Sequence, residues 1–233
     1  MSPDAERPEG GEVEQPGFLD GPGEEHAEGI ILVTVLRRLE TLYPFMAGHW
    51  QQVAFEAFAI GEELDLSREA LEQLRSCAFV MDIGMIDESI HFLVAAEAES
   101  GLDYMQNPDT RKLVERHPVL GSRKLEELDF AAEVVSAVRH HHEWFNGWGY
   151  PDGLSGVTIP MLSRVLAVSD AFVSTTRDLP YKAGCGEAEA LEEIVGYAGV
   201  QFDPWVVPAL EKVVNRKNAG PECLIDRTID LAF

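Results

Sequence analysis

The sequence predicts an all-α fold. From Ile30 onward apolar residues recur at helical spacing, and no run shows the period-two alternation between turn signals that marks β-strands. The chain has 233 residues, of which 45% are hydrophobic, so it can bury one large core, and its length favours one domain with extensions. No window approaches the ~18 uninterrupted apolar residues of a membrane-spanning helix. We therefore expect a helical domain without a membrane partner.

Residues that start and stop helices divide the pattern into segments. A helix is predicted from about residue 30 to 64, with a break or kink at Pro44 because proline removes a backbone donor. Ser67 is a suitable N-cap for a second helix that ends near Gly84. Shorter helices are predicted at about residues 88–100, 108–116, 118–128, 130–143, 160–176, 187–197 and 204–215. Pro208 fits the last of these poorly, since an interior proline disrupts a helix.

One long segment does not fit a helix. Residues 144–160, WFNGWGYPDGLSGVTIP, are too rich in glycine and proline for a helix and too aromatic for a disordered linker. Ordered loops of this kind often carry functional residues. We predict an ordered, functional loop here.

Negative charge dominates the composition. The chain has 41 Asp and Glu against 18 Lys and Arg, a net charge of −23. Residues 1–28 hold nine acidic residues against Arg7 alone, together with several prolines and glycines, and so predict a disordered acidic tail. The remaining negative charge disfavours duplex nucleic acid and anionic membranes as partners.

The N-terminus and the cysteines indicate the compartment. The first residues lack the basic and apolar regions of a secretory signal, which favours a cytoplasmic location. Cys77, Cys185 and Cys223 have no C-x-x-C spacing, which argues against a disulfide framework or a thiolate zinc site.

Histidines and aspartates are the candidate metal ligands. His49, His117 and the run at residues 140–142 fall near predicted helix ends, and a single histidine among them would mean little. Asp82 in FVMDIGMI and Asp170 in VLAVSDAFV interrupt apolar stretches, where a carboxylate is costly unless it is paired. A helix cap or an arginine partner would explain either aspartate alone. Two such carboxylates with several imidazoles favour a divalent metal such as iron, manganese, nickel or zinc.

The order of these motifs resembles the HD-GYP family. The chain reads His49, D-I-G at 82–84, H-P at 117–118, H-H-E at 141–143, G-Y-P at 149–151, and later P-Y-K at 180–182 and Q-F-D-P at 201–204. The family is a branch of the HD metal-dependent phosphohydrolases that degrades cyclic di-GMP in bacteria. The resemblance implies an HD-type helical bundle with an ordered GYP loop over residues 29–215, followed by a C-terminal extension at 216–233.

The resemblance also implies roles for particular residues. His49, Asp82 and Asp170 would hold one metal, and Asp82 as a bridge, with His117, His141 and His142, would hold a second. The centre would contain one or two ions, iron or manganese, and Asp82 and Asp170 would be catalytic through them. Tyr150, Lys182 and Arg177 would contact the substrate, cyclic di-GMP or a related phosphodiester.

The sequence departs from the family where chemistry is expected. Met81 stands in place of the histidine of the His-Asp pair, and a thioether is a poor ligand for these ions. Met85 replaces a phosphate-binding lysine, and Leu179 replaces the arginine that precedes P-Y. Asn146 and Phe45 replace two acidic residues of the pattern.

Three functions remain open on these residues. The first is a divergent cyclic di-GMP phosphodiesterase with a metal centre and reduced activity. The second is a catalytically silent module that binds signalling proteins as a scaffold. The third is an HD hydrolase adapted to another phosphoester.

Overall fold

The computed structural model describes residues 24–218 and confirms the all-α fold. This part of the chain contains α-helices and short 3₁₀ turns, and no β-strand. The α-helices are α1 (Glu24–Leu42), α2 (His49–Glu63), α3 (Arg68–Val80), α4 (Glu88–Glu99), α5 (Pro108–Val114), α6 (His117–Glu127), α7 (Ala132–His140), α8 (Met161–Thr176), α9 (Glu187–Gly196) and α10 (Val207–Asn218). The 3₁₀ turns are η1 (Pro44–Met46), η2 (Ile83–Ile86), η3 (Tyr104–Gln106) and η4 (Gly156–Thr158).

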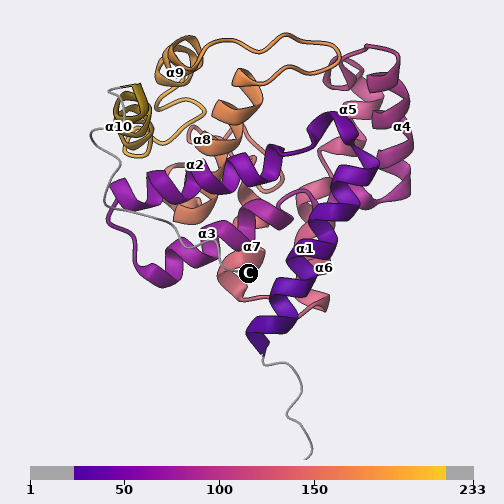
Figure 1. Cartoon of the computed structure of the whole chain (residues 1–233), viewed down its shortest axis with the longest axis horizontal. Coiled ribbons are helices and arrows are strands. Elements are labelled where there is room, and N and C mark those ends of the chain that lie inside the picture. Colours follow the sequence, from indigo (N-terminus) through magenta and orange to yellow (C-terminus); the bar gives the residue numbers. More distant parts are fainter. Residues whose placement is uncertain (1–23, 219–233) are drawn as a thin grey trace, which may run out of the picture.

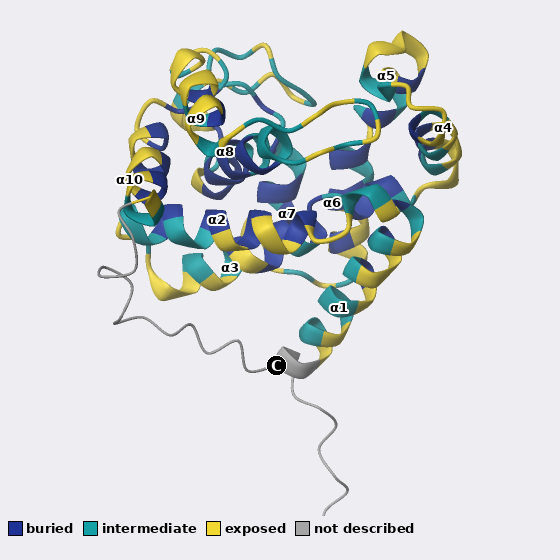
Figure 2. Cartoon of the chain, turned by 45° about the horizontal axis from the view of Figure 1, so that its top comes forward, coloured by how far each residue is buried: buried dark blue, intermediate teal, exposed yellow. Residues whose placement is uncertain are grey.

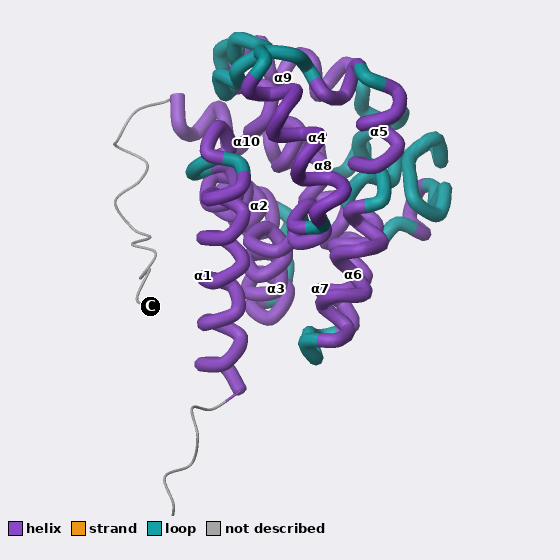
Figure 3. The backbone as a smooth tube through the Cα atoms, turned by 90° about the vertical axis from the view of Figure 1, so that its right-hand side faces the viewer, coloured by secondary structure: helices purple, strands orange, loops and turns teal. Residues whose placement is uncertain are grey.

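The helices form a bundle around α2, α3, α7 and α8. Helix α2 packs on both α3 and α8, and α7 packs on α6 and α8. Helices α4 and α5 lie at one end of the molecule and α9 and α10 at the other (Figure 1). Helix α1 runs along one side and contacts α3 (Figure 3). The burial pattern follows this arrangement, since the central helices are largely buried and the end helices largely exposed (Figure 2).

Apolar spacing explains the central helices. In α2, Val53, Ala57 and Ile60 recur every three or four residues, and all three side chains are fully buried. Gly61 extends this face and admits α3 closely, because a Cβ there would lie 2.7 Å from a methyl group of Leu71. Helix α8 is apolar around much of its circumference, which suits its position between several neighbours.

The predicted helix boundaries agree best with the structure where a proline or an N-cap residue determines them. The predicted break at Pro44 is confirmed, since α1 ends at Leu42 and Pro44 begins η1. Ser67 is the N-cap of α3, and its Oγ accepts a hydrogen bond from the amide of Ala70 at 3.2 Å. Helix α3 ends at Val80 rather than near Gly84, because a turn and η2 follow.

Two other boundaries differ from the prediction. Helix α10 begins at Val207 and not at residue 204, so Pro208 falls in its first turn, where a missing backbone N–H costs little. Helix α1 begins at Glu24 and not near Ile30, so the predicted tail boundary at residue 28 lies inside a helix. The Glu28 carboxylate accepts a hydrogen bond from Ser76 Oγ at 2.9 Å, a contact to α3 that the composition of the segment does not reveal.

The remaining terminal predictions lie outside the described residues. These are the disorder of residues 1–23 and the extension beyond residue 218. Within residues 24–218, no helix is both long and apolar enough to span a bilayer.

Candidate metal centre

The ends of four helices bring the predicted ligands together. His49 opens α2 and His117 opens α6, while His141 and His142 follow the last residue of α7. Asp82 lies in the turn between α3 and η2. Glycine permits the close approach of η2 to α6, because a Cβ on Gly84 would lie 2.1 Å from the carbonyl oxygen of His117.

His117 and His141 are held with their Nε2 atoms facing each other. Both rings are buried, and the two Nε2 atoms lie 3.2 Å apart. His117 Nδ1 lies 2.7 Å from the carbonyl oxygen of Val114, and His141 Nδ1 lies 2.6 Å from that of Val138. A carbonyl only accepts, so each Nδ1 donates its proton and each neutral ring presents a lone pair at Nε2. Two lone pairs face each other when both rings are neutral.

Asp82 adds a negative charge to these lone pairs. Its Oδ1 lies 3.2 Å from His117 Nε2, and the ring of His142 completes the cluster. One ligand atom from each of His117, His141 and His142 lies within 4.8 Å of the other two. Three imidazoles and a carboxylate that point at one another match the ligands of divalent transition metals.

The local electrostatics keep these groups in the forms that ligate metals. Burial, reinforced by the charge of His117, lowers the pKa of His141 to about 4. Burial and the neighbouring His141 and His117 hold the pKa of His142 well below its ordinary value. For Asp82, burial by itself would raise the pKa. The hydrogen bond and charge of His117, with the charges of His141 and His49, outweigh this effect, so the pKa of Asp82 lies well below its ordinary value. His141 and His142 are therefore neutral beside an ionised Asp82 at neutral pH.

His49 and Asp170 form a separate pair. His49 Nε2 lies 3.1 Å from Asp170 Oδ1, and Asp170 Oδ1 also accepts a hydrogen bond from Ser174 Oγ at 3.2 Å. His49 Nδ1 is buried and has no hydrogen-bond partner among the residues that the structure describes. Both residues line the same pocket as Asp82 and His142.

This pocket has a volume of about 190 Å³ and largely aromatic and apolar walls. Besides the polar residues already named, it is lined by residues that include Tyr43, Phe45, Trp50, Met85, Tyr104 and Tyr150. The Tyr150 ring lies over that of His142, with centroids 5.0 Å apart and planes 30° apart. Burial raises the pKa of Tyr150 above its ordinary value, so its hydroxyl stays protonated. The predicted loop is therefore ordered, and its tyrosine lies beside the imidazole cluster.

Polar contacts from α7 hold the GYP loop. Arg139 Nε and Nη2 donate to the two carboxylate oxygens of Asp152 at 2.7 and 2.9 Å, and His140 Nε2 lies 3.0 Å from the same carboxylate. The buried Glu143 accepts a hydrogen bond from the Asp152 amide at 2.7 Å. At the start of the loop, the amide of Phe145 donates to the carbonyl of Gln201.

We expect Arg139→Gln to loosen this loop without unfolding the bundle. The pair is about one third exposed, so its loss should cost about 1 kcal/mol of global stability or less. Amide hydrogen exchange should accelerate in residues 144–156 and stay unchanged in α2 and α8. Arg123→Gln, an exposed position on α6, is the matched control. Equal exchange rates in the two variants would contradict a positioning role for Arg139.

The predicted substrate-contacting residues are placed unequally. Tyr150 lines the pocket, whereas Lys182 is exposed. The residue before it, Tyr181, contacts the pocket wall, since the centroid of its ring lies 5.6 Å from that of Tyr104. Arg177 Nη2 donates to the carbonyls of Phe45 and Ala47, at 3.2 and 3.0 Å. A substrate role for Lys182 and Arg177 stays a prediction.

The substituted motif positions have structural roles. Met81 is fully buried in the core, and Met85 lines the pocket while its carbonyl accepts a hydrogen bond from Tyr43. Leu179 pairs with Lys182 through two backbone hydrogen bonds. Asn146 Oδ1 accepts from the amide of Trp148, which shapes the loop.

Trp50 is one of the pocket residues that the sequence analysis missed, together with Tyr43 and Tyr104. Its indole Nε1 donates to Asp82 Oδ2 at 2.9 Å. Its position directly after His49 was a signal of proximity, but the direction of a side chain in a first helical turn depends on tertiary packing.

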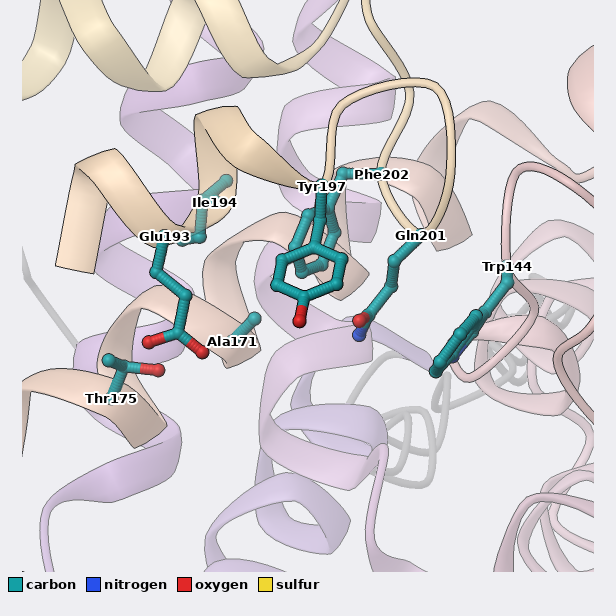
Figure 4. A pocket seen from close by; sticks show the side chains of 8 residues that line it. All are labelled: Trp144, Ala171, Thr175, Glu193, Ile194, Tyr197, Gln201 and Phe202. Atoms are coloured by element: carbon teal, nitrogen blue, oxygen red, sulfur yellow. The ribbon is translucent and has the colours of Figure 1, made fainter.

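A second pocket, of about 260 Å³, lies against α8 and α9 (Figure 4). Its walls are Trp144, Ala171, Thr175, Glu193, Ile194, Tyr197, Gln201 and Phe202. It contains no histidine and a single carboxylate, so it lacks a metal-ligand set. We therefore assign the candidate site to the pocket of the imidazole cluster.

Comparisons with known proteins place this helical bundle in a family. The model of the HD domain family matches residues 35–206. The cyclic di-GMP phosphodiesterase PA4108 of Pseudomonas aeruginosa is 43% identical over 103 residues, which cover 44% of this chain and 25% of that protein. The cyclic di-GMP phosphodiesterase response regulator RpfG of Xanthomonas campestris is 30% identical over 164 residues, which cover 69% of this chain and 41% of that protein.

A solved structure shows the same fold. The crystal structure of V-cGAP3, a cyclic GMP-AMP specific phosphodiesterase of Vibrio cholerae, superposes with a TM-score of 0.63 at 21% identity, over 82% of this chain and 49% of that one. The chain belongs to the HD domain family, and its predicted place in the HD-GYP branch is confirmed. The chain spans less than half of the length of the curated relatives it matches, 25% of PA4108 and 41% of RpfG.

Proposed function

We propose that this domain hydrolyses a phosphodiester bond of a cyclic dinucleotide, with cyclic di-GMP as the first candidate and with reduced activity. The observation that carries the proposal is the cluster of His117, His141, His142 and Asp82, of which Asp82 and His142 line the pocket. The relatives named above act on cyclic di-GMP or cyclic GMP-AMP, which supports this substrate class.

The residues fit a divalent metal. Their lone pairs face one another at hydrogen-bond distance without a proton to share in the neutral form, and their backbone partners fix the ring orientations. Nitrogen and oxygen ligands without thiolate suit iron or manganese. When bound, such an ion makes an attacking hydroxide available at neutral pH and stabilises negative charge on phosphoryl oxygens.

The chain's own residues bind and orient the substrate. Tyr43, Tyr104 and Tyr150 form walls that suit a planar base, and the Tyr150 hydroxyl remains a hydrogen-bond donor. Asp170, held by His49, places a carboxylate at the same pocket. These groups also exclude water from the cluster, which strengthens its electrostatic interactions.

Reduced activity follows from the missing cations. Among residues 24–218, no lysine or arginine lines the pocket, and the Arg177 guanidinium donates to backbone carbonyls. Loss of one preorganised electrostatic contact commonly costs about 2.7–4 kcal/mol of transition-state stabilisation. The same observation favours the second candidate, a silent module that binds signalling proteins as a scaffold.

One assay separates the three functions. Cyclic di-GMP, 3′3′-cGAMP and a generic phosphodiester are incubated with protein loaded with Mn²⁺ or Fe²⁺, and products are separated by chromatography. A linear dinucleotide that forms with metal and disappears with chelator supports the proposal. Bound metal without any product supports the silent module, and turnover of the generic ester alone supports another phosphoester as substrate.

His117→Ala should nearly remove metal from the centre. The change deletes a ring that contacts both Asp82 and His141, so metal affinity should fall by more than about 100-fold, since losing an outer partner of a ligand already costs 10–100-fold. Metal titration followed by elemental analysis measures the effect.

His91→Gln is the control for this change. His91 lies on α4 with its ring against Tyr43, and it is absent from the pocket lining and the cluster. Its affinity for metal should equal that of the wild type. Unchanged metal content in His117→Ala would contradict the assignment of the cluster.

A further inference from the structure

We propose that Trp50 restricts this centre to a single metal ion, held by His117, His141, His142 and Asp82, while His49 and Asp170 remain a metal-free hydrogen-bonded pair. The inference rests on the proposed function, because it concerns the same centre. It names the residue that sets the number of ions.

The two oxygens of the Asp82 carboxylate have different partners. Oδ1 lies 3.2 Å from His117 Nε2 in the imidazole cluster, whereas Oδ2 accepts the indole proton of Trp50 at 2.9 Å. A carboxylate that bridges two ions uses one oxygen for each. The oxygen that a second ion would share is here engaged by a donor that cannot itself ligate.

The histidines differ in the hydrogen bonds of their Nδ1 atoms. His117 and His141 each donate Nδ1–H to a backbone carbonyl, the arrangement that leaves Nε2 free to bind a metal. His49 Nδ1 is buried without a partner in the described part of the chain. With its proton on Nε2, the ring donates to Asp170 Oδ1 at 3.1 Å, and no cation is needed between these two atoms.

The Trp50 side chain cannot turn away from Asp82 at low energetic cost. Its side chain is 1% exposed within the hydrophobic core, and a buried indole N–H without an acceptor carries a desolvation penalty. Met81, beside Asp82 in the chain, is equally buried and offers no imidazole to compensate. The half-site beside His49 is therefore closed to an ion by fixed core residues.

Metal stoichiometry tests the inference directly. Wild-type protein saturated with Mn²⁺ and freed of excess metal should contain one ion per chain by elemental analysis. Trp50→Phe keeps a buried ring, removes the indole donor and frees Asp82 Oδ2, so the ratio should rise toward two. Trp148→Phe, at a tryptophan that is 80% exposed on the GYP loop, is the matched control and should remain at one.

A second measurement on the wild type does not depend on the variant folding. Electron paramagnetic resonance of the Mn²⁺-loaded protein should show isolated ions without exchange coupling. Coupled ions, two ions per wild-type chain, or a folded Trp50→Phe variant that stays at one ion would each overturn the inference and leave the proposed function standing. A wild-type chain that binds no ion would instead overturn the proposed metal centre together with it.

Discussion

Gly84→Ala should both destabilise the bundle and empty the metal centre. A Cβ at this position would lie 2.1 Å from the carbonyl oxygen of His117 and 2.8 Å from the amide nitrogen of Gly121. Both are backbone atoms, so no rotamer change relieves the clash, and η2 must separate from α6. We expect the free energy of unfolding to fall by about 3 kcal/mol or more, at the upper end of overpacking costs.

The same displacement would reach the ligands. Asp82 precedes η2 and His117 opens α6, so a shift between these elements moves the two residues relative to each other. Denaturant unfolding should give a lower midpoint at unchanged slope, and metal titration should show weaker binding.

Gly196→Ala is the matched control. This glycine is the last residue of α9, has an ordinary φ, and a Cβ there would meet nothing within 4 Å. Replacing it should be neutral or stabilise the protein by about 0.5–1 kcal/mol. If Gly84→Ala and Gly196→Ala unfold at the same midpoint, the close approach of η2 to α6 does not limit stability.

The sequence predicts the helices well because local signals define them. Pro44 breaks the first helical segment, and Ser67 caps α3 as expected. The start of α10 was misplaced because proline is tolerated in a first turn, so Pro208 marks a beginning that apolar spacing alone does not locate.

The residues of the candidate metal centre could be predicted from the sequence, but their geometry could not. His117, His141 and His142 do lie together, and Asp82 reaches them. The sequence could not show that Asp82 divides its two oxygens between His117 and Trp50, because that depends on how α2 packs against the turn after α3. Nor could it show that Arg177 donates to the carbonyls of Phe45 and Ala47, about 130 residues earlier in the chain.

Long-range charge pairs were equally invisible in the sequence, although they join distant elements. Arg164 pairs with the buried Asp203, and Arg216 pairs with Glu63. In an acidic chain the few cations are therefore used partly for packing. Lys217 is the most consequential of them, since it joins the last turn of α10 to the buried Glu56 of α2.

Lys217→Met should destabilise the protein by about 3–5 kcal/mol, the usual cost of removing one partner of a buried ion pair. Glu56 is fully buried, and its Oε2 has no hydrogen-bond partner among the described residues. After the change, Gln52 would be the one described side chain that still donates to Oε1. The Lys217 ammonium also lies 5.4 Å and 5.8 Å from the ring centroids of Phe55 and Phe172, contacts that the variant loses as well. Chemical denaturation measures the change.

Two further variants isolate the buried charge as the cause. Lys212→Met places the same substitution at an exposed position of α10 and should change stability by less than about 0.5 kcal/mol. The double variant Glu56→Leu with Lys217→Met removes both charges, and it should recover most of the lost stability, because replacing a buried ion pair by apolar residues is often neutral or stabilising. A double variant as unstable as Lys217→Met alone would mean that α10 is held by the packing of the lysine stem and not by its charge.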